Sequence, residues 1–114
     1  MTAEATTPPR SELLELVTMA EFLIRNGPQG AAAVATERLG EALLAYYQQL
    51  PATGSPEGDG LRREAVRLWS EVRLLSDRLR IGPIRRGVPP LRRKVEALLV
   101  MEAAAAVPAR RAAG

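Results

Sequence analysis

The sequence contains no cysteine and no histidine. It therefore has no disulfide framework, no thiolate nucleophile, no imidazole base and no usual zinc site. Carboxylate pairs do occur at helical spacing, at Glu12/Glu15 and Glu37/Glu41. Di-metal helical bundles combine such glutamates with Glu-x-x-His motifs, which this chain cannot supply. We therefore predict that the protein is not an enzyme and that it holds no cofactor and no metal.

Aromatic residues are scarce, with one tryptophan, two tyrosines and one phenylalanine among 114 residues, although 46% of the residues are hydrophobic. A core must then be built from leucine, valine and alanine, a composition that favours helix over sheet. The length suits one small domain with a single core. The sequence therefore predicts one all-α domain.

Long apolar runs are also absent, and no segment approaches the roughly 18 uninterrupted apolar residues of a membrane-spanning helix. The N-terminal segment MTAEATTPPR lacks the positive start and the apolar stretch of a signal peptide. We expect a cytoplasmic bacterial protein that does not span a membrane.

What the sequence does contain is apolar residues at helical spacing, most clearly in the segment LRREAVRLWSEVRLLSDRL at 61–79. Its apolar residues recur at intervals of three and four, the pattern of a helix that packs on other helices. The tryptophan, Trp69, flanks this stripe, and we expect it at the edge of the core. On the polar face, Arg67–Glu71 and Arg73–Asp77 are predicted ion pairs.

Four such segments, separated by turn-forming residues, predict four helices. They are expected to begin near Pro9 or Ser11, near Gly30, after Asp59 or Gly60, and near Pro90, and to end at Asn26, Leu50, Ile81 and Pro108. The sequence thus predicts an up-and-down bundle of four helices with a proline-rich break, GPIRRGVPP, before the last one. We place this bundle domain at 9–107, between disordered tails at 1–8 and 108–114.

The fourth predicted helix has the thinnest apolar face. Its apolar residues are Leu91, Val95, Leu98, Leu99 and Met101. Two interpretations remain open for them. They can pack within a closed bundle, or they can contact a helical segment of a partner protein.

Charge is divided unevenly along the chain. Residues 1–60 hold eight acidic and three basic residues, whereas 61–114 hold thirteen basic and five acidic residues. The densest basic cluster consists of Arg78, Arg80, Arg85, Arg86, Arg92, Arg93 and Lys94. This cluster suggests, as an alternative function, a small nucleic-acid-associated protein that uses segment 78–94. Against it, no aromatic residue is interleaved for base stacking, and mutual attraction of the two halves explains the division equally well.

The arrangement of motifs resembles flagellar export chaperones of the FlgN/FliT type. Gly27, Glu37-Arg38 and Leu43-Leu44 stand at positions comparable to those of the first two helices in that family, and LWSEVRLLSDRLRIGPIRRGVPPLRRKVEALL is similar to its later long helix. The resemblance implies a helical protein that keeps an axial flagellar subunit soluble by binding its C-terminal helix through the fourth-helix residues. We therefore predict a non-enzymatic protein-interaction module with an export-chaperone-like task, and a homodimer is compatible with the sequence.

Overall fold

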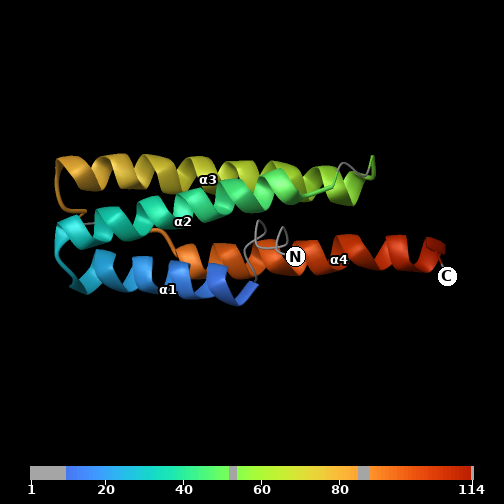
Figure 1. Ribbon diagram of the computed structural model, residues 1–114, viewed down its shortest axis with the longest axis horizontal. Helices are drawn as coiled ribbons and strands as arrows, with labels where there is room; N and C mark the ends of the chain where they lie inside the picture. Colours follow the sequence, from blue (N-terminus) through green and yellow to red (C-terminus); the bar gives the residue numbers. More distant parts are fainter. Residues whose placement is uncertain (1–9, 52–53, 85–87, 114) are drawn as a thin grey trace, which may run out of the picture.

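A computed structural model describes residues 10–51, 54–84 and 88–113, with side chains up to residue 105. The described residues form four helices and no strand: α1 (Arg10–Asn26), α2 (Gln29–Gln49), α3 (Pro56–Ile81) and α4 (Leu91–Ala113). Consecutive helices run in opposite directions and lie side by side along one long axis (Figure 1). The predicted all-α, up-and-down bundle of four helices is confirmed.

The helices pack in a closed ring. α2 contacts α1 and α3, and α4 contacts α3 and α1, so α1 and α3 lie diagonally across the bundle and run in the same direction. The buried core is aliphatic apart from one tyrosine; it comprises Leu13, Val17, Ala20, Ala32, Ala33, Leu39, Leu43, Tyr46, Leu61, Ala65, Leu68, Val72, Leu75, Leu79, Leu91, Val95, Leu98 and Leu99. Every helix contributes one stripe to it, as the spacing of the apolar residues predicts.

The start of α3 differs from its prediction. The helix begins at Pro56 rather than after Asp59 or Gly60, because Ser55 caps it and accepts a hydrogen bond from the backbone N–H of Gly58 at 3.0 Å. Proline is tolerated at the first helical position, where no intrahelical N–H bond is lost. The other boundaries of α1 to α3 lie within a residue or so of those expected.

α4 begins at Leu91 and continues through Pro108 to Ala113, beyond its predicted end. The alanine-rich composition of its last turns has the highest helix propensity, which outweighs the loss of one backbone hydrogen bond at the proline. Arg10 at the start of α1 pairs with Glu102 of α4 at 3.7 Å. The remainder of α4 extends past this N-terminal end of α1 (Figure 1). Segment 108–113, predicted as a disordered tail, is therefore part of α4, whereas residues 1–8 lie outside the described part of the chain.

The proline-rich break between α3 and α4 also packs on the bundle. Ile84 is partly buried against the core, and Val88 is partly buried. None of the helices in the described ranges combines the length and the apolar composition needed to cross a bilayer.

Candidate functional site

The predicted partner-binding side chains of α4 lie mostly inside the bundle. Leu91 and Val95 are fully buried, Leu98 is 2% exposed and Leu99 is 8% exposed. They pack with the core, so in this closed bundle α4 is an ordinary fourth helix. Met101 differs, because it is only partly buried.

An open groove runs between α3 and α4. It has a volume of about 250 Å³, and its lining is formed by Glu64, Arg67, Leu68, Glu71, Lys94, Ala97, Leu98 and Met101. Leu68 and Leu98 belong to the core, and Met101 packs against it, so these three side chains form an apolar floor. α4 packs less extensively on α3 than α2 does.

Charged side chains border this floor in two ion pairs. Lys94 Nζ lies 2.5 Å from Glu71 Oε2 across the groove, and Arg67 Nη1 lies 3.1 Å from Glu64 Oε2. Glu71 thus pairs with the neighbouring helix, and the predicted Arg67–Glu71 pair does not form. The groove therefore offers an apolar floor between charges of both signs.

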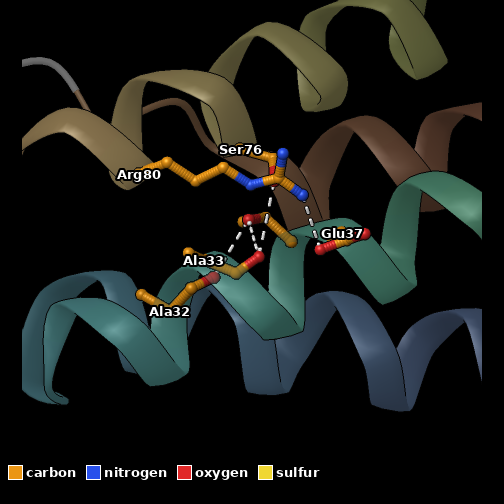
Figure 2. A network of polar contacts seen from close by, with 6 residues as sticks. Ala32, Ala33, Glu37, Ser76 and Arg80 are labelled. Carbon is orange, nitrogen blue, oxygen red and sulfur yellow. Dashed lines mark hydrogen bonds and ion pairs between the residues drawn. The ribbon is translucent and has the colours of Figure 1, made fainter.

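A second groove, between α2 and α3, has a volume of about 280 Å³ and a different character. It is lined by Glu37, Gly40, Glu41, Leu44, Trp69, Arg73, Ser76, Asp77 and Arg80. Arg80 Nη2 donates to Glu37 Oε1 at 2.8 Å, as Figure 2 shows. The guanidinium of Arg73 lies 5.5 Å from the Trp69 ring centroid, and the predicted Arg73–Asp77 pair is not formed. Trp69 itself packs at the edge of the core, as expected.

Two buried residues carry aliphatic hydroxyl groups: Ser76, which lines this second groove and is labelled in Figure 2, and Thr36. Thr36 Oγ1 is 2.9 Å from the carbonyl oxygens of both Ala32 and Ala33 on its own helix, and Ser76 Oγ of α3 donates to Ala33 O at 3.4 Å. Neither residue was predicted from the sequence, although the small residues around Thr36 are a signal of close helix approach. Both hydroxyls are already hydrogen-bonded, and that of Ser76 joins α3 to α2, so neither offers a free polar group to a ligand.

Three of the five described residues of the basic cluster form ion pairs within the fold. Arg80 pairs with Glu37, Arg92 pairs with Glu96 at 3.2 Å, and Lys94 pairs with Glu71. Arg78 and Arg93 are exposed and form no ion pair with a described residue. Arg85 and Arg86 lie outside the described residues. Much of the positive charge that suggested nucleic-acid binding is thus offset locally.

Tyr46 is a buried polar residue that the sequence analysis assigned only to the core stripe. Its side chain is 3% exposed, and neither its hydroxyl nor Glu102 Oε1 forms a hydrogen bond with another described residue. Burial, and then the charge of Glu102, raise the pKa of the Tyr46 hydroxyl. The neutral hydroxyl is therefore strongly favoured in the folded protein.

In the part of the chain that the structure describes, no three acidic side chains converge as a metal site would require. Comparison with known proteins finds no family model, no curated protein and no solved structure that matches the chain. The two grooves and the exposed helix faces are therefore the candidate surfaces for function.

Proposed function

We propose that the protein is a non-enzymatic interaction module that binds a helical segment of a partner protein in the α3–α4 groove. The observation that supports this proposal is the apolar lining of the groove between charged rims, in which Met101 and Ala97 supply the accessible apolar surface above the buried side chains of Leu68 and Leu98. A partner helix that places apolar side chains on such a floor buries both surfaces, and its polar face can meet the rims.

The size of the groove favours a protein side chain over a small molecule. Its volume of about 250 Å³ is below the roughly 300–1,000 Å³ of ordinary ligand pockets. It suits one or two aliphatic side chains of a helix. Met101 adds adaptability, because an unbranched thioether can fit differently shaped apolar groups. Val100, which is 68% exposed, and exposed Ala97 extend the apolar surface along α4.

Only some of the residues predicted to contact a partner belong to the proposed binding site. Leu98 and Met101 face the groove, whereas Leu91, Val95 and Leu99 hold α4 on the bundle from within. An export-chaperone-like task in a bacterial cytoplasm is the specific form that we propose, in which the bound helix is kept from premature assembly. Binding of this kind requires no opening of the bundle.

Site-specific photo-cross-linking in cells of the source organism tests the proposal. A photoreactive phenylalanine analogue replaces Ala97 in the α3–α4 groove or, as the matched control, Glu41 in the α2–α3 groove; both residues are exposed. We expect one discrete protein to be cross-linked from position 97 and not from position 41, through a peptide of helical sequence. Cross-linking from position 41 alone, or from neither position, contradicts the proposal.

Nucleic-acid binding is the second candidate, and exposed Arg78 and Arg93 favour it because no described carboxylate neutralises them. A mobility-shift titration with duplex and single-stranded DNA and RNA at low salt tests it. Binding that weakens on substitution of both arginines by glutamine supports this candidate, and absence of a shift at micromolar protein dismisses it.

A further inference from the structure

The outer face of α1 carries an exposed stripe of mixed character. Glu12, Glu15, Met19 and Phe22 follow one another at intervals of three, four and three residues, so they lie along one side of the helix. Met19 is 55% exposed and Phe22 is 57% exposed, and neither carboxylate pairs with a described residue. We call these four residues the α1 stripe. It presents negative charge first and large apolar side chains second.

The outer face of α3 carries a stripe of opposite charge. Arg63, Arg67, Leu74, Arg78 and Ile81 lie along one side of this helix and are all exposed, with Leu74 65% and Ile81 89% exposed. We call these five residues the α3 stripe. It has no acidic member, although Arg67 pairs with Glu64 beside the stripe at 3.1 Å in an exposed ion pair. Its first two arginines precede its large apolar side chains, as the two glutamates precede the apolar pair in α1.

The two stripes match in register when the helices are parallel. Seven residues separate Glu15 from Phe22, and seven separate Arg67 from Leu74. With Glu15 opposite Arg67, Phe22 therefore meets Leu74, and Glu12 is level with position 64, one residue from Arg63. An antiparallel arrangement with Glu15 opposite Arg78 pairs only one of the two carboxylates, because Glu12 then lies opposite Ile81.

We propose that the protein associates with itself, with the α1 stripe of one copy docked in parallel on the α3 stripe of a second copy. α1 and α3 lie diagonally in the bundle and run in the same direction, so the two stripes face opposite corners. The contact is therefore heterologous, and successive bundles line up side by side instead of closing into a two-fold dimer. A contact of about three helical turns is small, so the association is weak and transient.

Sedimentation equilibrium of the full chain between about 10 µM and 1 mM, at low salt, tests the proposal. The weight-average mass of the wild-type protein is expected to rise above 12.3 kDa with concentration. Arg63→Glu/Arg67→Glu and Glu12→Arg/Glu15→Arg are each expected to remain monomeric, because like charges then face each other. An equimolar mixture of the two variants is expected to associate again, since each acidic stripe now finds a basic one.

The control variant Arg25→Glu/Arg38→Glu changes the net charge as much as Arg63→Glu/Arg67→Glu does, at exposed positions outside both stripes. It is expected to associate like the wild-type protein, and circular dichroism confirms that each variant remains helical. A wild-type mass that stays at 12.3 kDa, or a mixture that stays monomeric, overturns the proposal. Loss of association in the control variant overturns it too, because net charge rather than the stripes would then be responsible.

Discussion

The two grooves that flank α3 are similar in volume but differ in their floors. Toward α2, the lining includes Ser76, whose hydroxyl is already hydrogen-bonded to Ala33 O. Toward α4, the buried side chains of Leu68 and Leu98 lie beneath partly buried Met101 and exposed Ala97. Satisfied polar groups gain little from a ligand, whereas accessible apolar surface gains by burial. This difference is the reason that we propose the α3–α4 side, and not the α2–α3 side, for binding.

Truncation of one buried leucine in α2 and one in α4 should show whether α4 packs more loosely on the bundle than α2 does. Leu39→Ala, in the fully buried stripe of α2, is expected to lower the free energy of unfolding by about 3–4 kcal/mol. Leu98→Ala is expected to cost about 2 kcal/mol, because Leu98 lines the groove, where the site can collapse around a truncated side chain more readily than in the interior. Urea denaturation of both variants measures these values. Equal losses would contradict a more loosely packed α4.

Arg62 links the first turns of α3 to the end of α2. Its Nη1 donates to Leu50 O at 2.9 Å, and its guanidinium lies 4.9 Å from the Tyr47 ring centroid. Arg62→Ala is expected to lower the free energy of unfolding by about 1–2 kcal/mol. Arg63→Ala, an exposed neighbour, is the control and should change it by less than about 0.5 kcal/mol. Thermal denaturation below the concentration of self-association distinguishes them, and similar effects would refute a specific role for Arg62.

Tyr46 tests a site at which a buried hydroxyl, unlike those of Thr36 and Ser76, forms no well-aligned hydrogen bond with a described residue, although, beyond the effect of burial, Glu102 lies near enough to raise its pKa. Tyr46→Phe is expected to raise the free energy of unfolding by about 1 kcal/mol, because it removes an unsatisfied buried hydroxyl. The raised pKa of the Tyr46 hydroxyl also makes the free energy of unfolding depend on pH. Above about pH 10 the unfolded chain loses this proton while the folded protein retains it, so wild-type stability falls as the pH rises.

The Tyr46→Phe variant lacks this contribution, so its stability advantage should widen above pH 10. Urea titrations between pH 8 and 11 measure the difference between the two proteins. A difference that stays constant over this range would show that Tyr46 titrates normally in the folded state.

Substitution of Gly40 is expected to change the free energy of unfolding least, and it tests how closely α2 and α3 approach each other. A Cβ at this position would lie 3.6 Å from Val72 Cγ1, an ordinary contact. Gly40→Ala is expected to stabilise the protein by about 0.5–1 kcal/mol through the better helix propensity of alanine. Gly54→Ala is the control, since its φ of 72° disfavours alanine and should make the change destabilising. Destabilisation at Gly40 would mean that α2 and α3 approach more closely than the structure shows.

The helices were predictable from the sequence because leucine spacing is a local property of each segment. The start of α3 was missed although Ser55-Pro56 is a recognisable capping pattern, since the glycines that follow were assigned to the turn. Ion pairing was harder to predict, because Glu71 has two possible partners, Arg67 four residues away and Lys94 on another helix. It pairs with Lys94, and the sequence does not show that the two helices are neighbours.

The candidate site was predicted only in part. The residues of α4 were singled out correctly as an apolar face, but which of them point inward depends on the rotation of α4 in the bundle. Leu99 is in the core while Met101 borders a groove, and both follow the same spacing rule. The lining of the groove comes from two helices, α3 and α4, so no single helix encodes it.

Binding of the partner's helical segment tests the central claim most directly. The peptide identified by cross-linking is titrated, with fluorescence anisotropy as the signal, against the wild-type protein, Ala97→Arg in the α3–α4 groove and Glu41→Arg in the α2–α3 groove. We expect Ala97→Arg to weaken binding at least about tenfold, equivalent to about 1.4 kcal/mol, and Glu41→Arg to leave the dissociation constant unchanged. Unchanged binding to Ala97→Arg, or an equal loss in Glu41→Arg, would contradict the assignment of the α3–α4 groove as the binding site.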